Sequence, residues 1–158
     1  MKKEVKIAYD VFSSIEELSD DRQRILEKAL EAVEKAYAPY SNFQVGAAVL
    51  LDDESVVVGN NQENIAYPSG LCAERVALFA ANANFPDKKV TKLAIAARGN
   101  LLKKEDVLSP CGSCRQVMAE VSNRQQSNFE ILLLNGDGSV MVFGKINDLL
   151  PFVFGNHQ

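Results

Sequence analysis

The chain has 158 residues, the size of one ordinary domain, and carries 17 basic against 21 acidic residues, a net charge of -4. Its 47% hydrophobic and 24% charged residues exclude a disordered chain, a collagen-like repeat and a disulfide scaffold. No basic cluster exceeds a pair of residues, which disfavours a nucleic-acid partner. No apolar stretch approaches the ~20 residues of a membrane span, and no signal peptide follows Met1, so we expect a cytoplasmic protein without a membrane partner.

Hydrophobic periodicity predicts helices and strands that alternate after an opening hairpin. Residues 1–19 form an N-terminal arm of unknown role, in which Glu4 to Phe12 alternates weakly, as an added strand would. The remaining predicted elements are a helix over 20–37 that ends before Pro39, strands over 45–51 and 55–60, a helix over 72–82, a strand over 90–97, a helix over 111–121, strands over 129–134 and 140–143, and a short helix over 146–150. This order is typical of an α/β fold, and we expect residues 1–158 to form one domain, a three-layer α/β/α sandwich with a mixed five-stranded sheet.

The three cysteines, Cys72, Cys111 and Cys114, fall at the predicted starts of two helices. A helix start favours thiolates, and a Cys-x-x-Cys pair places two sulfur atoms one turn apart, as tetrahedral zinc requires. The spacing therefore predicts one Zn²⁺ per chain, held by three thiolates with a fourth position open, which is the arrangement of a catalytic site. An open zinc binds water and lowers its pKa until hydroxide forms near neutral pH.

An internal histidine cannot serve as the acid/base group, because the single histidine is His157. Glu74 lies two residues after Cys72, and its side chain can reach round the first helical turn toward the metal, which suits a proton shuttle that is not itself a ligand. Three thiolates leave the site negative, and Arg75 is a candidate to offset that charge from the surrounding shell. Arg115 is a second candidate, or else a surface or interface residue.

The cysteines leave three other interpretations open. A structural zinc site would take His157 as its fourth ligand. A thioredoxin-like dithiol would use Cys111 and Cys114 and leave Cys72 idle. The third possibility is three buried, inert cysteines with no metal.

Five segments together make the chain resemble the small cytidine deaminases, from about Asp20 to Gly155. These segments are Tyr40–Ala48, Asn61–Asn64, Cys72–Arg75, Pro110–Gln116 and Leu149–Pro151. The resemblance implies a homotetramer that contains zinc and converts cytidine and 2'-deoxycytidine to the uridines in pyrimidine salvage. It implies that Cys72, Cys111 and Cys114 hold the zinc and that Glu74 moves the protons, a pattern known for zinc deaminases.

The resemblance also assigns the substrate contacts. Asn61 and Glu63 match the pair that binds the ribose hydroxyl, Phe43 matches the aromatic residue that packs on the pyrimidine, and Ala73 would offer backbone atoms to the base. Neighbouring subunits complete such sites, through positions that match Ile65, Tyr67 and Phe154. Ile65 is bulkier than the small residue often found at its position. If no neighbouring subunit covers them, Phe152 and Phe154 would fold back onto the core of their own chain.

Two other functions stay open. One is a related aminohydrolase that acts on a modified cytosine nucleoside such as blasticidin S, and Arg75 with the Asn61/Glu63 pair favours the cytidine enzyme over it. The other is a zinc-stabilised binding protein without turnover. Glu74 beside an open zinc position argues against such a protein, because a structural site has no use for either.

Overall fold

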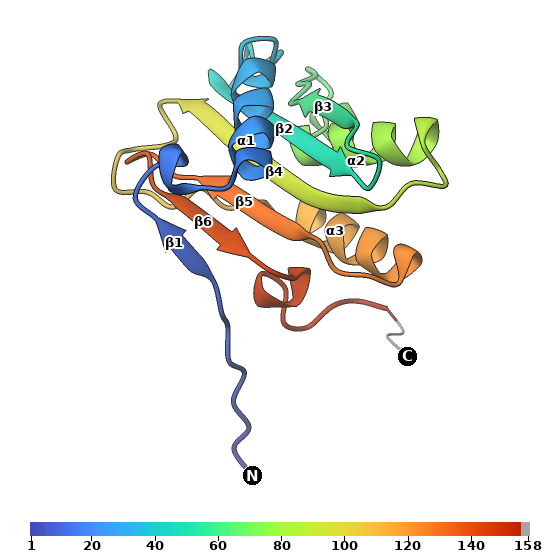
Figure 1. Ribbon diagram of the computed structural model, residues 1–158. Coiled ribbons are helices and arrows are strands. Elements are labelled where there is room, and N and C mark those ends of the chain that lie inside the picture. Colours follow the sequence, from blue (N-terminus) through green and yellow to red (C-terminus); the bar gives the residue numbers. More distant parts are fainter. Residues whose placement is uncertain (156–158) are drawn as a thin grey trace.

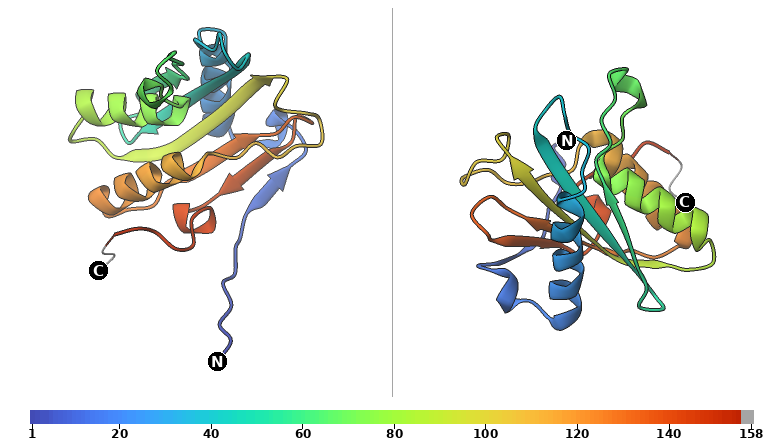
Figure 2. Two further views of the ribbon diagram at one scale, coloured as in Figure 1. Left: turned by 180° about the vertical axis from the view of Figure 1, so that it is seen from behind. Right: turned by 90° about the horizontal axis from the view of Figure 1, so that it is seen from above.

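A six-stranded sheet lies between two layers of helices in the computed structural model, which describes residues 1–155 (Figure 1). The strands are β1 (Asp10–Phe12), β2 (Phe43–Leu51), β3 (Val56–Asn60), β4 (Val90–Gly99), β5 (Glu130–Leu134) and β6 (Val140–Phe143). The helices are α1 (Asp20–Val33), α2 (Ala73–Asn84) and α3 (Gly112–Gln125), with 3-10 turns η1 (Ile15–Glu17), η2 (Tyr67–Ser69) and η3 (Ile146–Asp148). The helix α1 covers one face of the sheet, and α2 and α3 cover the other (Figure 2). The predicted three-layer sandwich is confirmed.

The strands run in the order β1-β6-β5-β4-β2-β3. Strands β4 and β5 are parallel, whereas every other neighbouring pair is antiparallel, so the sheet is mixed as predicted. A parallel pair cannot be joined by a tight turn, and the chain between β4 and β5 crosses over through α3. This crossover places the start of α3 on the same face of the sheet as α2.

The sheet has six strands where the sequence predicted five, because the N-terminal arm contributes one. Strand β1 pairs antiparallel with β6, with Val11 opposite Met141. The strand is shorter than the alternation from Glu4 to Phe12 predicted, and the start of the arm projects from the domain (Figure 1). Just before β1, the ring centre of Tyr9 lies 5.3 Å from that of Phe143 in β6. Val5 and Ile7 stay about half exposed, so their alternation finds no partner surface within residues 1–155 of the same chain.

Two apolar cores lie on the two faces of the sheet. The core under α1 includes Ile25 and Leu26, and the core under α2 and α3 includes Leu78 and Met118, all four fully buried. Gly46 of β2 lets α1 approach closely, because a Cβ atom at that position would lie 2.1 Å from the carbonyl oxygen of a residue in α1.

No helix within residues 1–155 combines the length and the apolar character that crossing a bilayer demands.

The helix α1 ends at Val33, although the sequence predicted a helix to Tyr37. The backbone of Tyr37 bridges to the segment after β3 instead: its N–H donates to the carbonyl oxygen of Asn61 (3.0 Å), and its carbonyl oxygen accepts from the N–H of Glu63 (2.9 Å). These bonds replace helical ones, and they bring the loop after α1 alongside Glu63.

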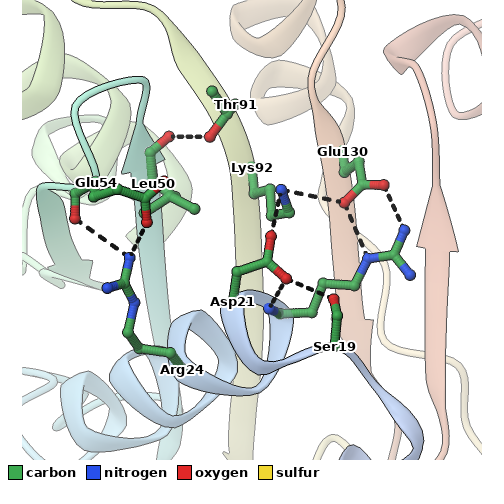
Figure 3. Close-up of polar contacts among 9 residues, drawn as sticks. Ser19, Asp21, Arg24, Leu50, Glu54, Thr91, Lys92 and Glu130 are labelled. Atoms are coloured by element: carbon green, nitrogen blue, oxygen red, sulfur yellow. Dashed lines mark hydrogen bonds and ion pairs between the residues drawn. The ribbon is translucent and has the colours of Figure 1, made fainter.

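Charged side chains attach the first turn of α1 to the sheet. Lys92 of β4 lies 2.8 Å from Asp21 and 3.8 Å from Glu130 of β5 (Figure 3). Arg22 donates two hydrogen bonds to the carboxylate of Glu130, and its guanidinium group lies 5.8 Å from the ring centre of Phe12 in β1. The ammonium group of Lys92, followed by the Ser19 hydroxyl, lowers the pKa of Asp21 to about 2. This cluster ties α1, β1, β4 and β5 together on the face away from α2 and α3.

Candidate active site and metal centre

The helices α2 and α3 begin at the predicted cysteines. Cys72 and Cys111 each occupy the N-cap position in an extended backbone conformation, and Cys114 lies in the first turn of α3. The position of α2 depends on Gly59 in β3, where a Cβ atom would lie 2.7 Å from the carbonyl oxygen of Ala73. The glycine therefore lets the first turn of α2, and with it Cys72, approach the sheet closely.

The three sulfur atoms form one cluster, in which every pair lies within 4.8 Å. The Sγ atoms of Cys72 and Cys111 are 3.9 Å apart, and those of Cys111 and Cys114 are 3.5 Å apart. Ligand sulfur atoms around a tetrahedral zinc, at the usual Zn–S length of ~2.3 Å, are separated by about 3.8 Å. The three cysteines are thus positioned to hold one zinc ion.

The spacing and the free state of the cysteines bear on the other interpretations. All three are free thiols. Cys72 belongs to the cluster and is not idle, as a dithiol of Cys111 and Cys114 alone would leave it. Cys111 is exposed, which does not fit three buried inert residues. His157, the fourth ligand of the structural alternative, lies outside the residues that the structure describes.

The thiol groups of Cys72 and Cys114 differ in how readily they ionise. Hydrogen bonding with Cys114, followed by that with Arg75, lowers the pKa of Cys72 to about 5. The same contact with Cys72, followed by burial, raises the pKa of Cys114. The Nη2 atom of Arg75 lies 3.8 Å from the sulfur atom of Cys72, and the buried Nε atom of Arg75 has no hydrogen-bond partner within residues 1–155. Arg75 therefore places its positive charge beside the sulfur atom of Cys72.

Glu74 lies in the first turn of α2 with only 5% of its surface exposed. Burial raises the pKa of this carboxyl group, and the negative charge of Cys72 raises it further. A carboxyl group with a raised pKa can take up and release a proton closer to neutral pH than an exposed glutamate can. The arrangement suits proton transfer next to the metal position.

A cleft of about 450 Å³ opens beside the cluster. This volume lies within the range of small-molecule sites. Of the residues that the sequence singled out, five line the cleft: Asn61, Glu63, Tyr67, Cys72 and Arg75. The other predicted site residues lie outside its lining.

Asn61 fastens the end of β3 to the start of β2. Its Oδ1 atom accepts from the N–H of Val45 (2.8 Å), and its Nδ2 atom donates to the carbonyl oxygen of Phe43 (2.9 Å). Phe43 is half-buried at the first position of β2. Asn61 therefore fixes the backbone on which Phe43 stands, a role that sequence reasoning did not identify.

Glu63 holds the loop before β2. Its carboxylate accepts from the N–H groups of Tyr40 (2.9 Å) and Ser41 (3.2 Å) and from the Ser41 hydroxyl (2.5 Å). The Ser41 hydroxyl is the main cause of the lowered pKa of Glu63. Ser41 and Tyr40 also line the cleft, and sequence reasoning missed both as site residues although they lie in the Tyr40–Ala48 segment. An ionised carboxylate at this position can accept hydrogen bonds from hydroxyl groups.

Ala73 is fully buried as the first residue of α2, whereas the residues assigned to neighbouring subunits are exposed. Ile65 is 82% exposed and Tyr67 is 76% exposed, and Tyr67 borders the cleft of its own chain and contacts the ring of Tyr40. Phe154 is 88% exposed. Its ring therefore does not fold back onto the core of its own chain.

Comparison with known proteins identifies the family. Residues 19–127 match the family model described as the cytidine and deoxycytidylate deaminase zinc-binding region. The chain is 40% identical to the cytidine deaminase of Halalkalibacterium halodurans over 85% of this chain and 94% of that protein. It is 41% identical to the crystal structure of cytidine deaminase from Burkholderia pseudomallei, with a TM-score of 0.71 over 83% of this chain and 97% of that one. The structure of cytidine deaminase from Mycobacterium tuberculosis is 34% identical, with a TM-score of 0.66 over 87% of this chain and all of that one. The extent of these matches, added to the clustered cysteines and the buried Glu74, shows that the chain belongs to the cytidine and deoxycytidylate deaminase family.

Proposed function

We propose that the chain catalyses the hydrolytic deamination of cytidine and 2'-deoxycytidine to uridine and 2'-deoxyuridine. The observation that carries this proposal is the buried carboxyl group of Glu74, which lies in the first turn of the helix that Cys72 caps. A metal site that serves only the fold gains nothing from a buried carboxyl group with a raised pKa beside it. Relatives named cytidine deaminase support the choice of substrate.

The nucleophile depends on the bound metal, and a side chain of the protein transfers the protons. Zinc, when bound by Cys72, Cys111 and Cys114, lowers the pKa of water and so supplies a nucleophile at neutral pH. Glu74 takes a proton from the water that attacks C4 of the cytosine ring. The same carboxyl group delivers this proton to N3. It then takes the second proton from the hydroxyl group now on C4, whose oxygen becomes the carbonyl oxygen of uridine, and passes it to the departing amino group, which leaves as ammonia. Each turnover consumes one water molecule and forms one uridine and one ammonia.

The nucleoside contacts come from the lining of the cleft and from two residues outside that lining, Phe43 and Ala73. Glu63, held ionised by Ser41, accepts a hydrogen bond from a ribose hydroxyl, and Asn61 lies beside it. Phe43 packs on the pyrimidine ring, and the backbone of Ala73 contacts the base. Arg75 offsets the thiolate charge from the shell around the metal.

The assembly we propose is a homotetramer with active sites at subunit contacts. Ile65, Tyr67 and Phe154 reach the site of a neighbouring subunit, and their exposure of 82%, 76% and 88% supports this. Large apolar side chains left in water are typical of surfaces that another chain covers. Residues 1–158 act as one domain, whose partners are the nucleoside and other copies of the chain, without nucleic acid.

The setting we propose is pyrimidine salvage in the cytoplasm. The three metal-binding thiols are free, and a reducing compartment keeps thiols in the form that binds zinc. Free nucleosides are the substrates that such a pathway returns to use.

Uridine formation from cytidine by the purified, zinc-loaded protein tests the function. We expect turnover that a chelator abolishes and added zinc restores, and turnover of 2'-deoxycytidine under the same conditions. Turnover of blasticidin S alone would identify the related aminohydrolase instead. Binding of cytidine without any uridine would point to the zinc-stabilised binding protein. Either result would overturn the proposal.

A further inference from the structure

The side chain of Gln116 forms both hydrogen bonds with the backbone of Phe154. Its Nε2 atom donates to the carbonyl oxygen of Phe154 (2.8 Å), and its Oε1 atom accepts from the N–H of Phe154 (3.2 Å). Within the described part of the chain, these are the two hydrogen bonds of residues 151–155. The side-chain amide of Gln116 thus forms the pair of backbone hydrogen bonds that an adjacent strand would form. Residues 151–155 pair with no strand of the described chain.

Arg115, the preceding residue, holds the start of the same C-terminal segment. Its guanidinium group donates to the carbonyl oxygens of Leu149 (2.8 Å) and Pro110 (2.9 Å). Pro110 directly precedes Cys111 of the metal cluster. The segment that leads to Phe154 is therefore attached at two points to the turn of α3 that follows Cys114.

Side chains between and beyond the two attachments point in different directions. Val153 packs against the core under α2 and α3, whereas Phe152 is 82% exposed and Phe154 is 88% exposed. The free energy of a phenylalanine ring is lower when the ring is buried than when it is exposed to water. The backbone of Phe154 is fixed by hydrogen bonds while its ring stays in water. This arrangement is explained if the ring contacts a molecule outside its own chain.

We propose that Gln116 is a positioning residue, which fixes the backbone of Phe154 so that its ring meets the nucleoside bound by a neighbouring subunit. The inference rests on the proposed function, in which Phe154 completes the neighbour's site. Gln116 touches neither substrate nor metal in this arrangement and acts only through Phe154. Arg115 anchors the start of the segment, so loss of Gln116 alone frees the ring without detaching the whole segment.

The test variant is Gln116→Met, which preserves the length of the side chain and removes both hydrogen bonds. The chain offers a matched control at the other end of α3. Gln125 accepts from the N–H of Val90 (2.9 Å) and donates to its carbonyl oxygen (3.0 Å), so Gln125→Met removes the same type of backbone contact far from the cleft. Zinc content and oligomeric state are measured for both variants before kinetics.

For Gln116→Met we expect KM for cytidine to rise about tenfold while kcat changes less than twofold, because a lost binding contact acts on KM. Gln125→Met should lower thermal stability and leave KM unchanged. Amide hydrogen exchange gives a second measurement: the peptide that contains Phe154 should exchange faster in Gln116→Met and not in Gln125→Met. Exchange that is equal in all three proteins would refute the contact.

A double-mutant cycle with Phe154→Ala separates positioning from general support of the fold. If Gln116 acts through Phe154, adding Gln116→Met to Phe154→Ala should change kcat/KM less than twofold further. An undiminished tenfold loss in the double variant would show that Gln116 acts elsewhere and would overturn the inference. A wild-type chain that leaves cytidine intact would instead refute the proposed function, and the inference would fall with it.

Discussion

Cys72 and Cys111 are equivalent in local structure, because each is the N-cap residue of a helix, and their sulfur atoms lie 3.9 Å apart although 39 positions separate them in the chain. A metal ion between them therefore joins the starts of α2 and α3. The unpaired N–H groups at each helix start favour negative charge near its cysteine. Arg75 adds a full positive charge beside Cys72.

Glu74→Gln should retain zinc, fold and nucleoside binding while kcat falls ~10²–10⁴-fold, the usual contribution of a general acid/base group. The substitution preserves the shape of a buried side chain and removes its ability to carry a proton. Glu120→Gln, at an exposed position of α3, is the control for the loss of one carboxylate. A Glu74→Gln enzyme with near-normal kcat would mean that a different group moves the protons.

Asn61→Ala and Glu63→Ala should both impair cytidine turnover, with kcat/KM reduced at least ~10-fold, but for different reasons. Asn61 ties β3 to the backbone of Val45 and Phe43, so its removal should also lower the free energy of unfolding by ~1–3 kcal/mol. Glu63 borders the cleft, so its loss should spare a cytosine compound that lacks the ribose hydroxyls. Calorimetry and kinetics on both substrates distinguish the two. Equal losses on both substrates for Glu63→Ala would show that this residue supports the fold and not sugar recognition.

Gly59→Ala should displace α2 from the sheet, because the added Cβ atom would lie 2.4 Å from the backbone nitrogen of Ala77 and backbone cannot rotate aside. Overpacking of this kind costs ~1–3 kcal/mol, or roughly 2–4 °C of Tm for each kcal/mol in a chain of this size. Zinc content should fall with it, since α2 carries Cys72. Gly144→Ala is the control, because no atom lies within 4 Å of its added Cβ. Identical Tm and zinc content in the two variants would contradict this account of α2.

Acid should weaken the contact between α1 and the sheet. The pKa of Asp21 falls from an ordinary 3.8 to about 2 in the folded chain, first through Lys92, so the unfolded chain binds more protons there in acid. The stabilisation is complete above about pH 4 and is lost as pH falls toward 2. Asp21→Asn should therefore flatten the fall in stability between pH 4 and pH 2, measured by urea unfolding. Asp20→Asn removes the neighbouring charge, and a matching flattening in that variant would count against the role of Lys92.

Two impaired variants should gain activity when mixed. Glu74→Gln lacks the proton carrier, and Phe154→Ala lacks the exposed ring, and the residual activity of each alone is measured first, so that recovery means uridine formation above the sum of the two. If Phe154 completes a neighbour's site, subunit exchange creates sites that combine an intact Glu74 with an intact Phe154. Uridine formation by the mixture is the measurement. No recovery, despite subunit exchange proven by mass spectrometry, would place Phe154 in the site of its own chain.

Local signals predicted most of the fold. Helical spacing from Ile25 to Val33, and the strands on either side of residues 135–139, depend on neighbouring residues, and both are in the structure as predicted. The predicted end of α1 was wrong, because the backbone of Tyr37 bonds to a segment more than twenty residues later. Hydrophobic periodicity carries no information about such a pairing. The arm was uncertain for the same reason: a partner in β6 decides which of its residues form a strand.

The sequence singles out candidate site residues by their chemistry, whereas residues that act through their position do not stand out in it. Three cysteines and a glutamate at helix starts identify a metal site by residue type. Gln116 and Ser41 are common polar residues, and only the folded chain brings them to Phe154 and Glu63. Asn61 was singled out for sugar binding, and its hydrogen bonds to β2 appear only when the register of the two strands is known.

Strand β1 has a consequence for how copies of the chain can assemble. A sheet grows by adding a strand to an open border, where unpaired N–H and C=O groups act as a template. Here β1 occupies that border on β6, and it is only three residues long, too short to template another strand securely. The opposite border is β3, which within residues 1–155 pairs with β2 alone. The border on β6 therefore offers little template for a sheet that continues into another copy, and we expect copies that meet there to do so through side chains.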